Sequence, residues 1–226
     1  MSGTLYGIGI GPGDPELLTL KAVRLIAACP VLAWPAPLQG DGLARTIAAP
    51  HIPAGKTEIA IRLSFRPERD DTDDAYDCGA ATIAGHLEQG RDVAVLCEGD
   101  PLFFGSFIYL MTRLSGRFPI QVVPGIASPM AAAAVALHPL STLEDAVALI
   151  PATRPEAEIE RLLQAAESAV IMKIGRHLPK VRRVLDRLGL THKALVVERA
   201  TQDAQRLIPL ADAAEAPYFS LILVHA

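Results

Sequence analysis

The 226-residue sequence has few cysteines, few aromatic residues and no excess of positive charge. Its three cysteines, Cys29, Cys78 and Cys97, are widely spaced and form no CxxC pair, which argues against a disulfide framework and a cysteine-rich zinc site. Lysine and arginine number 21 against 25 acidic residues, and this net charge of −4 argues against a general nucleic-acid-binding protein. We therefore expect reduced thiols in a cytoplasmic protein, with no metal site and no nucleic-acid partner.

Long hydrophobic runs are also missing, although half of the residues are hydrophobic and the mean hydropathy is +0.30. The most apolar window, residues 126–137, contains Ser128 and Pro129, whereas a membrane-spanning helix needs about 20 apolar residues. The opening residues, MSGT, show no basic segment ahead of an apolar run. We expect no transmembrane segment, no signal peptide and no membrane partner, and enough apolar residues for one or two cores.

Short apolar runs alternate with helical patterns in the first half of the chain. Residues 4–9 and 93–97 predict strands, and the second run is continuously apolar, as in a strand that is covered on both faces. Residues 73–89 predict a helix, because apolar side chains recur there at spacings of three and four. Those side chains are Tyr76, Ala80, Ile83 and Leu87.

One more strand and two more helices are predicted in the first half. A short strand is predicted over residues 31–33, and Pro35 and Pro37 are expected to close it. A helix is predicted over residues 104–114, and Thr19 is a plausible N-cap for a helix over residues 20–28.

The second half of the chain ends in strands without long helices between them. Residues 194–197, 206–209 and 219–224 predict strands, which indicates a mixed sheet. We predict an α/β fold with two α/β domains: residues 1–118 with a mostly parallel sheet, and residues 119–226 with a mixed sheet.

The first glycine-rich segment reads GIGIGPGDP at residues 7–15, between a predicted strand and a predicted helix. This position raises the possibility of a dinucleotide-binding fingerprint. However, two prolines lie in the segment, and residues 29–34, where an acidic ribose ligand belongs, contain no Asp or Glu. A nicotinamide cofactor is therefore disfavoured, and a tight turn between strand and loop remains an alternative reading of the glycines.

The second segment, EGDPLFFG at residues 98–105, directly follows the apolar strand at residues 93–97. Open α/β sheets bind ligands at the carboxyl ends of their strands. Gly99 lets a ligand approach the backbone closely, and the Asp100 carboxylate can accept hydrogen bonds from a ligand. Alternatively, Asp100 only caps the turn that follows it.

Two later segments also stand where strands are predicted to end. Residues 123–128, VPGIAS, precede an alanine-rich helix whose small side chains permit close approach of a ligand or another helix. Residues 198–201, ERAT, place polar groups at the end of a strand. Both segments are therefore expected at the ends of strands, where a ligand can contact them.

Taken in order, these segments resemble the motifs of the tetrapyrrole (corrin/porphyrin) methyltransferase family, whose members use S-adenosylmethionine. Residues 5–22 match the first motif, residues 98–101 the second and residues 124–128 the third. Residues 198–201 and 217–224 match the C-terminal motifs. The resemblance spans essentially the whole chain, and five ordered motifs are far more specific than one glycine loop.

The resemblance implies a homodimer of two-domain α/β chains, with S-adenosylmethionine and the substrate in the cleft between the domains. S-adenosylhomocysteine would be what remains of S-adenosylmethionine after methyl transfer. Segments 59–77, 96–101 and 172–176 look most like those of members that methylate C-20 of precorrin-2 in cobalamin biosynthesis. Carried over by position, the cofactor contacts fall on Glu98, Gly99, Asp100, Phe103, Ala127, Ser128, Ile174 and Ala200.

Two of these positions depart from the family pattern. Ala127 stands where relatives often carry Thr or Ser, so a side-chain hydrogen bond is lost there. Ala200 stands where some relatives carry Gly. Several of the implied contacts would use backbone groups, so the side chain can vary.

The implied substrate is a tetrapyrrole with many carboxylates, so this acidic chain must concentrate its positive charge locally. Arginine suits this role because it pairs with carboxylates through two hydrogen bonds. Each such residue can also be a solvated surface charge, and the acidic run at residues 70–74 reads as a solvated helix start and not as a metal site. The substrate-contact candidates are Arg66, Arg69, Lys173, Arg176 and Arg199, together with Arg62 and His177.

Methyl transfer from a sulfonium needs no strong acid, because the leaving thioether is neutral. We expect catalysis mainly by positioning and by exclusion of water. Removal of the proton from C-20 would call for a base, and its identity is open among Asp14, Glu98, His177 and Glu198. Rival readings are a cobalt-containing precorrin-2 as the substrate and, in a different class, a non-catalytic tetrapyrrole-binding protein.

Overall fold

The computed structural model describes residues 1–63 and 70–225 and contains two compact units, Met1–Ala127 and Ser128–Ala226. Arg66 and Arg69 therefore lie outside the described residues. The domain boundary expected at residues 118/119 lies ahead of β5 (Ile120–Val123). β5 pairs in register with β1 (Leu5–Gly9), which makes it a strand of the first unit.

Five parallel strands form the sheet of the first unit, in the order β3-β2-β4-β1-β5. The other strands are β2 (Val31–Pro37), β3 (Thr57–Leu63) and β4 (Val93–Cys97). Every residue of β4 is buried. This confirms the prediction that the continuously apolar run is a strand covered on both faces.

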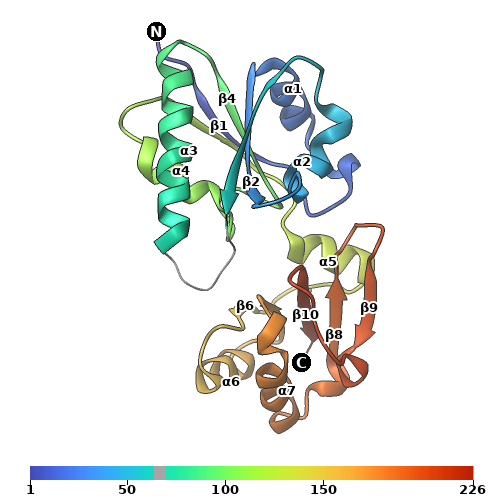
Figure 1. Cartoon of the computed structure of the whole chain (residues 1–226). Coiled ribbons are helices and arrows are strands. Elements are labelled where there is room, and N and C mark those ends of the chain that lie inside the picture. The colour runs from blue at the N-terminus through green and yellow to red at the C-terminus, as the bar shows by residue number, and fades with distance from the viewer. Residues whose placement is uncertain (64–69, 226) are drawn as a thin grey trace. The chain divides into compact units, whose positions relative to one another are not determined.

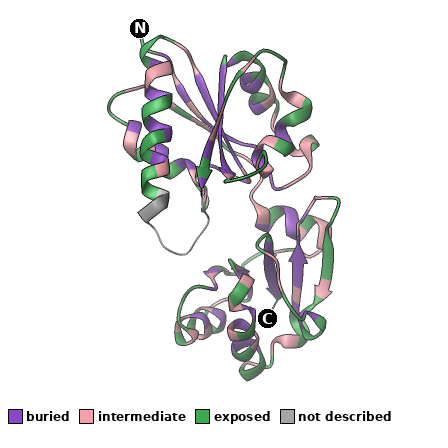
Figure 2. Ribbon diagram, in the orientation of Figure 1, coloured by how far each residue is buried: buried purple, intermediate pink, exposed green. Residues whose placement is uncertain are grey.

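Helices cover both faces of this sheet (Figure 1). α1 (Leu20–Ala28) and α2 (Leu43–Ala48) share one apolar cluster with one side of the sheet. α3 (Asp70–Glu88) and α4 (Phe107–Leu114) share a second cluster with the opposite side. The buried colour in Figure 2 follows the strands and the inward sides of these helices. Short 3-10 helices, η1 (Pro15–Leu17) and η2 (Ala49–His51), lie in the connections.

The helix signals in the sequence correspond to real contacts. Thr19 caps α1, because its hydroxyl oxygen accepts a hydrogen bond from the Ala22 N–H at 3.1 Å. The four apolar residues expected on one side of the helix at residues 73–89 are all buried in α3. Their burial confirms the prediction that these residues share the buried side of a helix.

Two elements of the first unit differ from the prediction. β2 continues through both prolines to Pro37 and pairs with β3 along its whole length. Pro35 and Pro37 are two residues apart, so both lack an N–H on the same side of the strand, and β4 pairs only as far as Ala33. α4 starts at Phe107 and not at residue 104, because Phe104 has a left-handed φ of 54°.

The sheet of the second unit is mixed, as the sequence predicted. Its order is β6-β7-β10-β8-β9; β6 and β7 are parallel, and the other neighbours are antiparallel. The strands are β6 (Val147–Pro151), β7 (Ser168–Met172), β8 (Ala194–Glu198), β9 (Arg206–Pro209) and β10 (Ser220–His225).

Three helices pack on this second sheet (Figure 1). α6 (Glu156–Gln164) and α7 (Leu178–Arg187) form the main core of the unit with one side of the sheet. α5 (Ser128–Ala136) contacts β10. The connections contain η3 (Gly175–His177), η4 (Thr191–Lys193) and η5 (Leu210–Asp212). No helix in the described part of the chain is long and apolar enough to cross a membrane.

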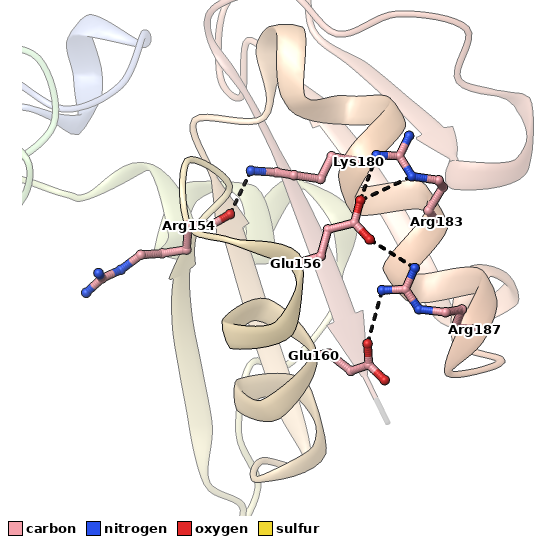
Figure 3. A network of polar contacts seen from close by, with 6 residues as sticks. All are labelled: Arg154, Glu156, Glu160, Lys180, Arg183 and Arg187. Carbon is pink, nitrogen blue, oxygen red and sulfur yellow. Dashed lines mark hydrogen bonds and ion pairs between the residues drawn. The ribbon is translucent and has the colours of Figure 1, made fainter.

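Ion pairs join α6 to α7 on the outside of the second unit (Figure 3). Glu156 accepts hydrogen bonds from Arg183 at 2.6 Å and from Arg187 at 3.0 Å, and these two guanidinium groups hold the pKa of Glu156 below its usual value. Arg187 also pairs with Glu160 at 3.0 Å. Arg183 and Arg187 are already paired with carboxylates of the protein, so they are poorer candidates for binding an anionic ligand.

Candidate functional site

Three loops of the first unit meet at the carboxyl ends of its strands. They follow the adjacent strands β4, β1 and β5. The Gly99 N–H donates to the Gly11 carbonyl at 2.8 Å, and the Gly11 N–H donates back to the Gly99 carbonyl at 3.3 Å. α1 and α4, which follow β1 and β4, lie on opposite faces of the sheet. Neighbouring parallel strands whose connections leave to opposite faces mark the usual ligand site of an open α/β sheet.

Glycines permit these loops to touch through their backbones. A Cβ atom at Gly125 would lie 2.1 Å from the Gly99 carbonyl oxygen, and one at Gly9 would lie 2.5 Å from the Gly125 nitrogen. Gly99 itself has a left-handed φ of 64°. The glycines read from the sequence as aids to ligand binding thus have a structural task, which is the close packing of one loop against another.

Asp100 fastens the second loop to the third. One of its carboxylate oxygens, Oδ1, accepts a hydrogen bond from the Leu102 N–H at 2.9 Å, and the other, Oδ2, accepts one from the Gly125 N–H at 3.0 Å. The turn-capping alternative is therefore part of its role. Each carboxylate oxygen has two lone pairs, so the half-buried side chain still offers acceptor positions to a ligand.

Glu98 lies two residues before Asp100 and has different hydrogen-bond partners. Burial raises the pKa of its carboxyl group, and hydrogen bonds from its own backbone N–H and from the Ala44 N–H at the start of α2 act in the opposite direction. A carboxyl group with a raised pKa at a strand end can exchange a proton nearer to neutral pH than a free Glu.

Apolar side chains form the outer part of the second loop. The rings of Phe103 and Phe104 meet edge to face, with centroids 5.0 Å apart. Phe103 is partly buried, whereas Leu102 and Phe104 are exposed, at 49% and 47%. Aromatic and aliphatic surface next to a few polar groups is typical of small-molecule sites.

The remaining predicted cofactor contacts are divided between the two units. Ala127 ends the first unit and Ser128 begins α5, and both residues are half-buried. Ile174 and Ala200 are buried in the second unit, at 0% and 8% exposure. Ile174 packs in the core of that unit, and its backbone is buried together with its side chain.

The second unit brings two of the predicted loops to one edge of its sheet. β7 and β8 are both antiparallel to β10, so they end on the same side. Met172, at the end of β7, pairs with Leu221, and Glu198, at the end of β8, pairs with the adjacent Ser220. The loops that begin at residues 173 and 199 therefore start at neighbouring positions of this edge.

Several of the candidate loops contain strained backbone. Left-handed φ values occur there at Phe104 (54°), Lys173 (57°), Arg199 (46°) and Thr201 (65°), and they also occur at Leu137 and Leu143, between α5 and β6. Such conformations are unfavourable for residues other than glycine and persist only where the surroundings hold them. Such residues in the loops after β4, β7 and β8 are consistent with a functional role of these three loops.

The described basic candidates have different surroundings. Lys173 and Arg176 are exposed and Arg199 is half-buried, all three at the loop edge of the second sheet. Burial lowers the pKa of His177, and the charges of Lys180 and Arg176 lower it further. Arg62 is engaged in the first unit, where it donates to the carbonyls of Pro37 (2.9 Å) and Gly40.

The candidate bases are also differently engaged. Asp14 accepts a hydrogen bond from the Glu16 N–H at 2.8 Å and so caps η1. Glu198 is buried and pairs with Arg206 at 3.5 Å. Among residues 1–63 and 70–225, no three His, Cys, Asp or Glu side chains gather in a way that could hold a metal ion.

Sequence reasoning missed the contacts that hold these loops in shape. The packing role of Gly9 and Gly125 and the hydrogen bond from the Thr201 N–H to the Gln205 side chain (2.7 Å) belong to this group. The glycine spacing was a visible signal, although it suggested a ligand and not a neighbouring loop. Nothing in the sequence distinguished Gln205 from other surface glutamines.

Comparison with known proteins gives a consistent family. Residues 4–214 match the family described as Tetrapyrrole (Corrin/Porphyrin) Methylases. The chain is 43% identical to a precorrin-2 C(20)-methyltransferase from Sinorhizobium sp, with 98% of this chain and 95% of that protein covered. It is 32% identical to the cobalt-precorrin-2 C(20)-methyltransferase of Salmonella typhimurium, with 100% and 97% covered.

Solved structures share the fold. A cobalt precorrin-4 methyltransferase of cobalamin biosynthesis superposes with a TM-score of 0.76 at 21% identity, over 98% of this chain and 94% of the other. The uroporphyrin-III C-methyltransferase of Thermus thermophilus, in a complex with S-adenosyl homocysteine, gives a TM-score of 0.72 at 23% identity, over 98% and 97%.

Proposed function

Because the chain belongs to the tetrapyrrole (corrin/porphyrin) methylase family, we propose that it is an S-adenosylmethionine-dependent methyltransferase that converts precorrin-2 to precorrin-3A by methylating C-20. This reaction belongs to cobalamin biosynthesis. The observation that carries the proposal is the 43% identity to the Sinorhizobium precorrin-2 C(20)-methyltransferase over 95% of that protein. The Salmonella typhimurium relative is named for a cobalt-containing substrate, which is the alternative within the same reaction.

The loops of the first unit fit S-adenosylmethionine chemically. The carboxylates of Glu98 and Asp100 suit the hydroxyl and ammonium groups of the ligand, and Phe103 suits its flat ring. When bound, S-adenosylmethionine supplies an electrophilic methyl group with a neutral leaving group. We assign its contacts to Glu98, Gly99, Asp100, Phe103, Ala127, Ser128, Ile174 and Ala200.

The charge of the loop edge of the second unit supports binding of an anionic tetrapyrrole. We assign the substrate carboxylates to Lys173, Arg176 and Arg199; Arg66 and Arg69, outside the described residues, are proposed from the sequence alone. These contacts orient the macrocycle, and we expect water to be excluded from the reacting carbon. Positioning and a dry site then supply most of the rate enhancement.

Mass spectrometry tests the reaction directly. The protein is incubated with S-adenosylmethionine and metal-free precorrin-2, and in parallel with the cobalt form, and the methylated carbon is located by NMR with a ¹³C-labelled methyl group. We expect one methyl group on C-20 of the metal-free substrate. Methylation of the cobalt form alone would favour the alternative substrate, and tetrapyrrole binding without methylation would favour a non-catalytic binding protein.

We also propose that the protein is a homodimer in the cytoplasm. Several apolar side chains are exposed in the second unit, and a partner copy would cover some of them; among them are Met130, Leu137, Leu143, Val147 and Leu149. The three cysteines, all in the described part of the chain, are free thiols, which suits a reducing compartment. Sedimentation at micromolar concentration should give twice the 24.0 kDa chain mass, and a monomer there would refute the dimer.

A further inference from the structure

The loop between β8 and β9, residues 199–205, is longer and more strained than its connection requires. Two residues are enough to join antiparallel strands. Here the loop contains left-handed backbone at Arg199 and at Thr201, and Thr is β-branched, which makes this conformation especially unfavourable. A long, strained connection between two paired strands indicates that its conformation serves a purpose.

The side chain of Gln205 folds back across this loop and holds it. Its Oε1 accepts a hydrogen bond from the Thr201 N–H at 2.7 Å. The backbone of Gln205 donates to the Gln202 carbonyl at 2.9 Å, and Gln202 donates to the Arg199 carbonyl at 2.9 Å. The two left-handed residues are thus linked to one exposed glutamine by a continuous set of hydrogen bonds.

The two ends of the loop are fixed as well. Glu198 and Arg206 stand opposite each other in the β8–β9 register and form an ion pair at 3.5 Å, with Glu198 buried. The Arg199 N–H donates to the Phe219 carbonyl at 2.8 Å, which ties the start of the loop to the chain entering β10. With the ends fixed, the hydrogen bond between the Thr201 N–H and the Gln205 side chain helps to set the middle of the loop.

We propose that Gln205 is a positioning residue that keeps residues 199–201 in the conformation that binds S-adenosylmethionine; this rests on the proposed function. Ala200, the assigned cofactor contact, lies between the two left-handed residues, so their φ values set the direction of its backbone N–H and carbonyl. If the loop relaxes, only a fraction of the molecules is competent to bind, and the apparent dissociation constant rises by the inverse of that fraction. Gln205 acts through the loop and needs no contact with the ligand.

The test compares Gln205→Ala with Gln205→Glu, which keeps an oxygen acceptor for the Thr201 N–H. Calorimetric titration gives the dissociation constant of S-adenosylhomocysteine, and steady-state kinetics give KM for S-adenosylmethionine and kcat. We expect Gln205→Ala to raise both constants about 3- to 10-fold, the range for one lost hydrogen bond, with kcat unchanged at saturating cofactor. Gln205→Glu should stay within about twofold of the wild type. Gln164→Ala, at an exposed position of α6, is the control for the loss of a surface glutamine.

Several outcomes would overturn the assignment of Gln205. One is wild-type affinity and KM in Gln205→Ala. Another is an equal loss in the Ala and Glu variants, because the oxygen acceptor would then not matter. A third is a lower melting temperature of Gln205→Ala with no change in KM, which would indicate a purely structural residue. If the wild-type protein fails to bind S-adenosylhomocysteine, the proposed function itself fails, whatever the variants do.

Discussion

Replacing Gly125 with alanine should disturb the loops of the first unit more than any change to a surface side chain. The new methyl carbon would lie 2.1 Å from the Gly99 carbonyl oxygen and 2.8 Å from the Cα atom of Gly9. Real Cβ atoms essentially never approach another heavy atom within 3.0 Å. Both neighbours are backbone atoms, so no side chain can rotate away, and one loop must move by about 1 Å.

The cost follows from this displacement. Overpacking of this kind destabilises a protein by about 1–3 kcal/mol. For a chain of this length, that corresponds to a drop in melting temperature of roughly 2–12 °C. The same shift pulls the Gly125 N–H away from Asp100, so the second and third loops lose their alignment. A 1 Å error in the positions of binding groups can reduce activity about 100-fold.

Gly85→Ala is the matched control for this experiment. Gly85 lies inside α3, and a Cβ atom there has no neighbour within 4 Å. The same substitution should therefore stabilise the helix by about 0.5–1 kcal/mol and leave methyl transfer unchanged. Thermal melting and methyl-transfer assays are run on both variants. The packing argument is refuted if Gly125→Ala has the melting temperature and the methyl-transfer activity of the wild type.

Three further predictions concern single groups. Asp100→Ala should lower stability by about 1–3 kcal/mol and weaken S-adenosylhomocysteine binding, because two backbone N–H groups lose their acceptor. Asp100→Asn should give values between those of the wild type and Asp100→Ala. Thermal melting measures the stability and calorimetry the affinity, and lost stability at unchanged affinity would show that Asp100 is only a structural cap. Burial lowers the pKa of His138, and the charge of His225 lowers it further. The unfolded chain therefore binds a proton more readily than the folded protein, and the melting temperature should fall as the pH is lowered from about 7 to about 5. A His138→Gln variant whose melting temperature falls equally steeply with pH would contradict this. Lys173→Ala with Arg176→Ala should raise KM for the tetrapyrrole and leave cofactor affinity unchanged, with a smaller effect at high salt; kinetics unaffected at both salt concentrations would remove these residues from the substrate site.

The elements that were predicted well have strong local signals. Tyr76 and Leu87 lie at opposite ends of one helical stripe, and both are buried in α3. The prolines of β2 misled because a sequence does not show where a neighbouring strand ends. β4 stops pairing with β2 at Ala33, and beyond that residue the missing proline N–H groups cost nothing.

The candidate site was predicted in outline but not in its internal contacts. Strand ends and loop motifs placed the segments that begin at residues 98, 124 and 198. The hydrogen bond from the Gly125 N–H to Asp100 joins residues 25 positions apart, and such a pairing depends on which strands are neighbours. Left-handed backbone at Thr201 is equally hidden, because Thr has no intrinsic preference for it.

The position of β1 between β4 and β5 has a consequence for how the chain folds during synthesis. β1 pairs with β4 and β5, and the Thr4 N–H bonds to the Asp92 side chain across 88 residues of sequence. At about 5–20 residues per second, β1 waits roughly 5–20 s for its first partner strand. During that interval both of its edges are open to pairing with other nascent chains, and sheets built from such distant contacts close slowly. The yield of folded protein should therefore depend on translation speed and on chaperones that shield this apolar strand.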